Sequence, residues 1–258
     1  MYTLKTFLIL LFLIPTIANC GTIDPNNQDA EYINFGEKHR CVVPISGIDK
    51  ASNKQYYASS VVIKPKVIVT AAHILTETVP ETAFIIVNNE KIKIIAFVFP
   101  KDFSLDKHGE KDIAVALLEK EVLLDFYPEL YEDQNEVGKV CSISGHGATG
   151  SYFDGANKYD GKKRAGSNIV DEIANELLVC SVKGLPKTRL EFLIANGDSG
   201  GGLFIDKKLA GINSCVMAED KKADSNYADW SGHTRVSIHK QWIDEISTMF
   251  SKLEGKKE

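Results

Sequence analysis

Long hydrophobic runs are nearly absent from this 258-residue sequence. Its longest unbroken apolar stretch, residues 7–14, is far shorter than the roughly 20 residues that a membrane-spanning helix needs. The stretch follows a short segment with one lysine, and Pro15 ends it before the small residues that precede Cys20. This pattern predicts a secretory signal peptide over residues 1–20 and no transmembrane span.

Residues 17–20 leave a second interpretation open. Their sequence, Ile-Ala-Asn-Cys, has the outline of a lipoprotein box, in which the cysteine is acylated. Such boxes usually have a small residue directly before the cysteine, and Asn19 is a poor fit there. We therefore predict a secreted protein, extracellular or periplasmic, with a lipid anchor at Cys20 as the alternative.

Long basic runs and metal-type cysteine spacings are also missing. The sequence has 30 lysines and arginines against 35 aspartates and glutamates, and the short clusters at residues 162–164 and 256–257 are predicted to be solvated loop and tail charges. This balance argues against a nucleic-acid partner. No cysteine pair has C-x-x-C spacing, so the sequence predicts no zinc site, and nothing in it calls for a cofactor.

Four cysteines lie beyond residue 20, namely Cys41, Cys141, Cys180 and Cys215. An even number of cysteines in an exported protein is typical of disulfide bonding, so we expect at least one disulfide among them. The sequence does not choose between the alternative pairings, because pairing depends on geometry.

The remaining chain has the pattern of a β protein. Residues 21–40 are polar and are predicted to form an N-terminal arm. From Cys41 onward, short runs rich in Val, Ile and Phe alternate with turn residues, which predicts an all-β antiparallel barrel or sandwich. Apolar residues recur at helical spacing from Trp242 to Leu253 and predict a C-terminal helix. We expect one folded domain over residues 41–258.

The string Gly197-Asp198-Ser199-Gly200-Gly201 is the strongest local signal of chemistry. A serine hydroxyl becomes a useful nucleophile only when a base takes its proton. The flanking glycines allow a sharp turn, which can point backbone N–H groups into one small space. Ser199 is therefore the candidate nucleophile, and the amides of Gly197 and Ser199 are candidates for stabilising an oxyanion.

Two further residues complete a candidate catalytic set. His73 follows the apolar run at residues 67–69, and a neutral imidazole at the end of a strand can act as a general base. Asp112 opens another apolar run, where a buried carboxylate needs a partner such as a histidine N–H. The chain order is His73, Asp112, Ser199, which is the order of the chymotrypsin class of serine hydrolases.

These motifs resemble those of the trypsin/chymotrypsin family of serine peptidases, over most of the chain from Cys41 to the C-terminal helix. The resemblance implies two antiparallel six-stranded β-barrels with the active site between them, and hydrolysis of a protein or peptide substrate. It also implies that Ser214 supports the Asp112 carboxylate and that Ser214, Cys215 and Val216 bind substrate backbone. The motifs are Thr70-Ala71-Ala72-His73, Asp112-Ile113-Ala114, Gly145-His146-Gly147, the 197–201 string, Gly211-Ile212-Asn213-Ser214, Thr234-Arg235-Val236 and Trp242-Ile243.

The sequence departs from the family pattern at several places. Ile74 replaces the cysteine that often follows the catalytic histidine, and Cys215 stands where tryptophan is usual. The family's disulfides therefore do not transfer to this chain. The competing hypothesis is a binding protein on an inactive protease scaffold, although such proteins typically lack a triad residue and all three are present here.

Specificity follows from the same resemblance. The residue six places before the nucleophile lies at the base of the primary specificity pocket, and here it is Leu193 rather than an aspartate. A buried cation needs a buried counter-charge, so arginine or lysine before the scissile bond is the least expected choice. An apolar or small side chain is expected first, and an acidic one second because His233 lies near the back of the pocket.

Overall fold

The computed structural model describes residues 21–107 and 109–254. The predicted signal peptide, the alternative lipid site at Cys20 and the basic pair at residues 256–257 lie outside the described residues. Within them, none of the helices is long and apolar enough to cross a bilayer.

The first half of the chain folds into a closed barrel of six strands in the order β2-β3-β4-β7-β6-β5. Buried and exposed residues alternate along part of β6, as expected for a strand with one face toward a core. Asn88 and Asn89 link β5 to β6 with positive φ angles of 50° and 64°, the conformation that a tight hairpin turn requires. The strands are β2 (Val42–Ile48), β3 (Gln55–Lys64), β4 (Val67–Thr70), β5 (Phe84–Val87), β6 (Glu90–Val98) and β7 (Ala114–Leu118).

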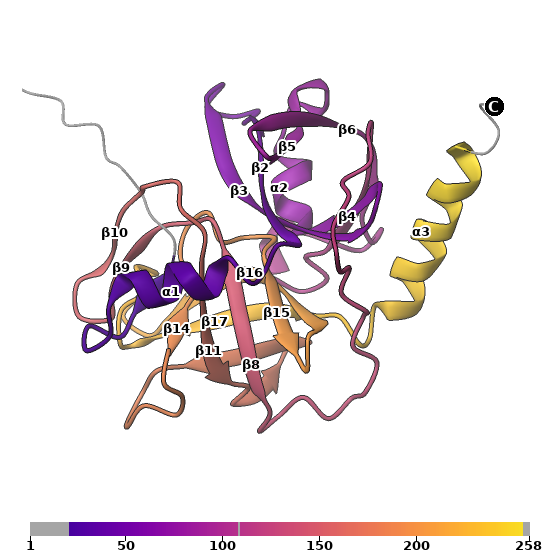
Figure 1. The fold of residues 1–258 in the computed structure, drawn as a ribbon. Coiled ribbons are helices and arrows are strands. Elements are labelled where there is room, and N and C mark those ends of the chain that lie inside the picture. Colours follow the sequence, from indigo (N-terminus) through magenta and orange to yellow (C-terminus); the bar gives the residue numbers. More distant parts are fainter. Residues whose placement is uncertain (1–20, 108, 255–258) are drawn as a thin grey trace, which may run out of the picture.

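The second half forms a seven-stranded antiparallel sheet in the order β11-β8-β15-β16-β17-β13-β12. Figure 1 shows this half lying beside the first barrel, with the C-terminal helix α3 (Lys240–Glu254) to one side. The predicted all-β fold with a C-terminal helix is confirmed. The strands are β8 (Val140–Gly145), β11 (Arg164–Ile169), β12 (Glu172–Ala174), β13 (Leu177–Ser181), β15 (Gly202–Ile205), β16 (Lys208–Ala218) and β17 (Asp229–Arg235).

A smaller four-stranded sheet, ordered β10-β9-β1-β14, builds the N-terminal segment into the second half. Its strand β1 (Thr22–Ile23) runs parallel to β9 (Thr149–Ser151) and antiparallel to β14 (Phe192–Leu193), and β10 (Gly155–Lys158) pairs with β9. Residues 21–40 are therefore packed onto the second half, as Figure 1 shows for α1 (Asp29–Gly36). The shorter helices are α2 (Ala72–Thr76) and the 3-10 turns Pro80–Thr82 and Leu105–Lys107.

Arg164 corrects one expectation from the sequence. Its side chain was predicted to be solvated, but only 1% of the residue is exposed. Its Nε and Nη2 donate to the two carboxylate oxygens of Asp29 at 2.6 and 2.7 Å, and Nη1 and Nη2 donate to Asp160 at 3.0 and 2.9 Å. A buried guanidinium needs such partners, and one of them comes from a distant helix that the local sequence does not reveal.

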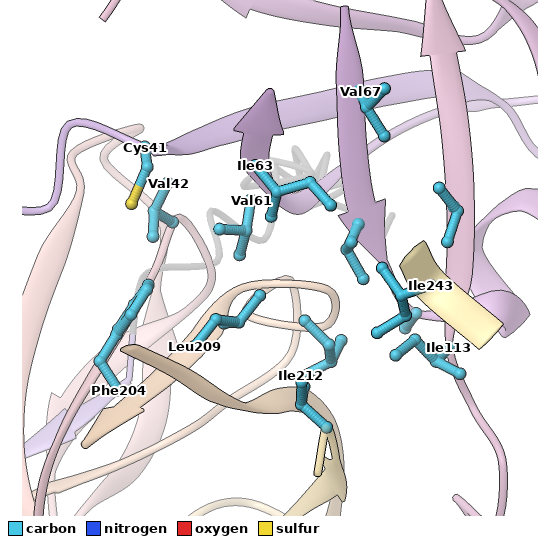
Figure 2. Packing of buried hydrophobic residues seen from close by; sticks show 14 of the residues in the cluster. Cys41, Val42, Val61, Ile63, Val67, Ile113, Phe204, Leu209, Ile212 and Ile243 are labelled. Atoms are coloured by element: carbon cyan, nitrogen blue, oxygen red, sulfur yellow. The ribbon is translucent and has the colours of Figure 1, made fainter. Parts of the chain in front are cut away.

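A hydrophobic cluster joins the two halves and receives the C-terminal helix. Ile113 from the first half, Leu209 and Ile212 from the second, and Ile243 and Phe250 from α3 all belong to it and are buried. Figure 2 shows Ile243 beside Ile113, with Leu209 and Ile212 to the left of them. Burial of this apolar area at about 25 cal/mol per Å² holds the two halves in a fixed relation, which the site between them requires.

The four described cysteines are free thiols, so the predicted disulfide is not present in this structure. Cys141 on β8 and Cys180 on β13 lie near each other, with their Sγ atoms 4.0 Å apart and both residues buried. The two strands stand toward opposite ends of the seven-stranded sheet, so these side chains meet across its interior.

Candidate active site

Strand pairing brings His73 and Asp112 together. Antiparallel β4 and β7 pair Thr70 with Ala114, which places the histidine just after one strand opposite the aspartate just before the other. Nδ1 of His73 lies 2.7 Å from Oδ2 of Asp112, and the backbone N–H of His73 donates to Oδ1 at 2.9 Å. The carboxylate thus holds both the ring and the backbone of His73.

Ser214 supplies a further donor to the same carboxylate. Its hydroxyl donates to Oδ2 of Asp112 at 2.6 Å, and Thr234 Oγ1 donates to the Asp112 backbone oxygen at 3.0 Å. Only 2% of Asp112 is exposed, so the hydrogen bonds from Ser214 and His73 replace the water that its carboxylate would otherwise hold. Both donors come from the second half of the chain, and they join it to the aspartate of the first.

Ser199 lies in the turn that precedes β15, next to Ser214. The backbone of Gly200 donates to Asn213 O at 2.7 Å, and Asn213 N donates to Gly201 O at 2.9 Å. The Ser199 hydroxyl donates a long hydrogen bond of 3.5 Å to Ser214 O. Ser199 and His73 line one cleft of about 300 Å³, which the two halves form between them.

The peptide between Asn196 and Gly197 lies at the wall of this cleft, which both residues line. Asn196 O accepts from Ala148 N at 2.6 Å, and the N–H of the same planar peptide, that of Gly197, therefore points the opposite way. Within the described part of the chain, neither Gly197 N nor Ser199 N has a hydrogen-bond acceptor. Gly197 has φ of +90°, a conformation that favours glycine. Two unengaged amides beside a serine hydroxyl are suited to holding an oxyanion.

The sequence model of the trypsin family matches residues 35–243, which is more than half of the chain. The chain belongs to the trypsin family. The resemblance carried by the sequence motifs is thereby confirmed, although no curated protein matches this chain in sequence.

Solved structures similar to this trypsin-family chain share its fold at low sequence identity. HL collagenase matches with a TM-score of 0.65 and 15% identity, covering 81% of this chain and 94% of its own. Neuropsin from mouse brain matches with a TM-score of 0.64 and 15% identity, covering 82% and 96%. An inactivated protease paralogue of the scabies mite matches with a TM-score of 0.62 and 14% identity, covering 81% and 95%. Trypsin-like folds therefore include both named proteases and an inactivated relative.

Asp198, within the family's serine motif, shapes the turn that carries Ser199. It is completely buried, and its carboxylate oxygens accept from Gly147 N at 2.8 Å and Ala195 N at 2.9 Å. A Cβ at Gly145 would lie 2.2 Å from Asp198 Oδ1. This close approach explains the glycine in the Gly145-His146-Gly147 motif.

Ser59 is a site residue that the sequence did not single out. Its hydroxyl donates to Gly197 O at 3.0 Å and accepts from His146 N at 2.9 Å, while its backbone N–H donates to Ser199 O at 2.9 Å. Ser59 belongs to β3 of the first barrel, so it ties that barrel to the nucleophile turn. A serine within an apolar strand carries no local signal of this role.

The residues predicted to bind substrate lie in two different places, some near Ser199 and Leu193 away from it. Ser214, Cys215 and Val216 lie on β16 next to Ser199, and Val216 pairs with Ser231 of β17. Leu193 is instead 1% exposed and packs with Tyr152 and Val182, where β1 covers its strand. The structure thus brings the β16 residues to the nucleophile and buries Leu193 beneath the N-terminal segment.

His233 is fully buried behind the nucleophile turn. Its Nδ1 lies 2.9 Å from Oδ1 of Asn213, whose Nδ2 donates to Asp198 O and Ser144 O, both at 3.1 Å. Burial lowers the pKa of His233 from 6.5 to about 3, so the ring is neutral near neutral pH. Asn213 belongs to a motif that the sequence analysis singled out, but the role of its side chain was not predicted, because its side-chain contacts are all distant in the chain.

Proposed function

We propose that this trypsin-family chain is a secreted serine endopeptidase with His73, Asp112 and Ser199 as its catalytic triad. The observation that supports this most is the triple engagement of the Asp112 carboxylate by His73 Nδ1, His73 N and Ser214 Oγ. A carboxylate held in this way fixes the His73 tautomer, with the proton on Nδ1 and the lone pair on Nε2. That lone pair is what a serine nucleophile needs.

In the proposed reaction, the Ser199 hydroxyl turns from Ser214 O toward His73 and attacks the carbonyl carbon of a peptide bond. The proton of Ser199 moves to Nε2 of His73, and the amides of Gly197 and Ser199 hold the oxyanion. His73 then protonates the leaving amine, and an acyl-enzyme remains on Ser199. Water attacks this ester by the same route and releases the acid product.

An inactive binding protein on the same fold is the competing function. Two observations favour it: the Ser199 hydroxyl bonds to Ser214 O at 3.5 Å, and an inactivated paralogue is among the similar structures. The low identity of that neighbour restricts the comparison to fold. The His73–Asp112 hydrogen bonds and the position of Ser199 and His73 in one cleft support the enzyme over this alternative.

A fluorophosphonate probe tests the proposal, because it reacts with an activated serine. We expect the wild-type protein to be labelled on Ser199, and the Ser199→Ala variant to lose both labelling and peptidase activity. Ser142→Ala is a matched control, since Ser142 also lies 2.9 Å from a histidine nitrogen, Nε2 of His39, but has no neighbouring carboxylate on that ring. Equal labelling of wild type and Ser199→Ala would refute the assignment.

We also propose that the enzyme prefers an apolar or small side chain before the scissile bond. Val216 faces Ser231 across paired strands, the Ser231 hydroxyl accepts from Ile194 N at 2.9 Å, and Ile194 and Ala195 are buried apolar residues. A neutral His233 offers no positive charge to an acidic side chain. Profiling on a mixed peptide library tests this, and cleavage mainly after arginine or lysine would overturn it.

Secretion is the last part of the proposal and rests on the sequence of residues 1–20. Mass spectrometry of the exported protein should give a mature chain that lacks the apolar run at residues 7–14. A diacylated Cys20 would replace the secreted assignment by a lipid-anchored one, and an uncleaved chain inside the cell would contradict both.

A further inference from the structure

A second cavity, of about 710 Å³, lies at the junction of the two halves and shares no lining residue with the catalytic cleft. We call it the junction pocket and define it by Phe35, His39, Arg40, Phe126, Ser142 and Phe204. Its walls come from α1, the segment before β2, the connection between the halves, β8 and β15. Its volume is within the range of small-molecule sites, which often lie at such junctions.

Aromatic rings form a continuous wall of this pocket. The rings of Phe35 and His39 meet edge to face with centroids 5.1 Å apart, and those of His39 and Phe204 lie 5.3 Å apart. Phe126 also lines the pocket, and it is 54% exposed, so its ring is accessible to a ligand. Figure 2 shows Phe204 at the edge of the hydrophobic cluster, on the same side as Cys41, which also lines the pocket. The wall is suited to a flat apolar body.

His39 and Ser142 place one polar pair in the apolar wall. Phe35 O can only accept, so it takes the Nδ1 proton of His39 at 3.1 Å, and Nε2 accepts from the Ser142 hydroxyl at 2.9 Å. Burial, together with Lys163 and Lys38 nearby, lowers the pKa of His39 from 6.5 to about 4. The ring is therefore neutral, and the charge of the pocket comes from its other side chains.

Those charges are mainly positive, in contrast to the net charge of −5 for the whole chain. Lys38, Arg40 and Lys207 line the pocket, while Asp125 is the acid among its lining residues and pairs with Arg40. Lys38 also lies over the Phe35 ring, with Nζ 5.8 Å from the centroid. Cationic side chains next to an aromatic wall match a ligand with an apolar body and one anionic group.

We propose that the junction pocket binds a small amphipathic anion, an aromatic body carrying a carboxylate or sulfonate. The body lies against Phe35, Phe126 and Phe204, and the anionic group is held by Lys38 and Lys207. Complementary charge makes this occupant more favourable than a neutral molecule of the same shape. The proposal does not depend on peptidase activity, because it uses none of the residues assigned to catalysis.

Two dyes that differ only in charge provide the test on the mature full-length protein. 8-Anilinonaphthalene-1-sulfonate carries the anionic group, and N-phenyl-1-naphthylamine has the same rings without it. We expect one sulfonate dye per chain by isothermal titration, bound at least tenfold more tightly than the neutral dye at low salt. Added NaCl should reduce that difference, because it screens the charges at the mouth.

Variants locate the site. The double variant Lys38→Glu/Lys207→Glu should lose at least tenfold in sulfonate-dye affinity and little in neutral-dye affinity, whereas Lys93→Glu, an exposed lysine of β6 outside the pocket, should leave both unchanged. If the double variant does not fold by circular dichroism, Lys207→Glu alone and the wild-type salt titration decide. Equal affinity for the two dyes, or an unchanged affinity in the lysine variants, would overturn the proposal.

Discussion

The hydroxyl of Ser214 donates a 2.6 Å hydrogen bond to Oδ2 of Asp112, the same oxygen that lies 2.7 Å from Nδ1 of His73. The two residues come from different halves of the molecule, so correct docking of the halves sets the orientation of the carboxylate. The packing of the hydrophobic cluster between the halves therefore also affects the orientation of the His73 ring, because the Asp112 carboxylate holds that ring.

The substitution Asp112→Asn tests whether the oriented carboxylate sets the tautomer of His73. The amide N–H of asparagine would face Nδ1 of His73 and favour the tautomer that is protonated on Nε2, which cannot accept a proton from Ser199. We expect kcat to fall by about 10⁴-fold with little change in KM, measured on a peptide ester or amide substrate.

Asp102→Asn is the control for this substitution, because Asp102 is an exposed partner of Lys111 outside the cleft. Its kcat should stay within about twofold of wild type, as expected for an exposed pair. A fall of less than tenfold for Asp112→Asn, with the fold intact by circular dichroism, would remove Asp112 from the proposed mechanism.

The burial of His233 predicts that the stability of the protein depends on pH. Its pKa is about 3 in the folded protein and near 6.5 when unfolded, so the unfolded chain binds the extra proton between these values. The stabilising contribution is complete above pH 6.5 and is lost as the pH falls toward 3. Between pH 7 and pH 5 we expect this residue alone to lower the free energy of unfolding by about 2 kcal/mol.

Urea denaturation of wild type and His233→Gln at both pH values measures this contribution. The variant cannot titrate at that position, so its loss of stability on acidification should be smaller by about the same amount. Identical losses in the two proteins would show that His233 is accessible to protons in the folded state.

Cys141 and Cys180 are the pair that we propose for a disulfide in the oxidising compartment that the predicted signal peptide implies. Their Sγ atoms need to approach from 4.0 Å to about 2 Å, with both electrons passing to a disulfide oxidant and both protons to solvent. Closing this loop of about 40 residues should stabilise the fold by about 4 kcal/mol. Peptide mapping under non-reducing conditions should yield a cross-linked pair containing these two cysteines, with Cys41 and Cys215 alkylated as free thiols. Alkylation of all four would show that the exported protein remains reduced.

The hydrogen bonds between Asp29 and Arg164 connect the N-terminal segment to β11 and should contribute to stability. Asp29→Ala removes two hydrogen bonds from the buried Arg164 but leaves those from Asp160, and the Asp29 side chain is itself 44% exposed. We expect a loss of about 1–2 kcal/mol in unfolding free energy, measured by thermal denaturation. Glu31→Ala on the same helix is the matched control, because its partner Arg189 is exposed, and it should change stability by less than about 0.5 kcal/mol. Similar effects of the two substitutions would show that the hydrogen bonds between Arg164 and Asp29 do not stabilise the fold.

The candidate catalytic residues could be selected from the sequence because their signals are local. A serine between glycines, a histidine after one apolar strand and an aspartate before another are short motifs, and their order identifies the family. The C-terminal helix was predictable for the same reason, since its apolar spacing lies within 12 residues of sequence.

Tertiary structure alone decided which distant residues meet and which side chains lose their water. Arg164 has the sequence context of a solvated loop but is buried because Asp29 reaches it, and His233 is neutral because the fold encloses it beside Asn213. Ser59 and the junction pocket likewise depend on segments that meet only after the two halves dock, and the Cys141–Cys180 pair depends on two distant strands that meet within the second half. Burial and long-range pairing are properties of the packed chain, and no window of sequence contains both partners.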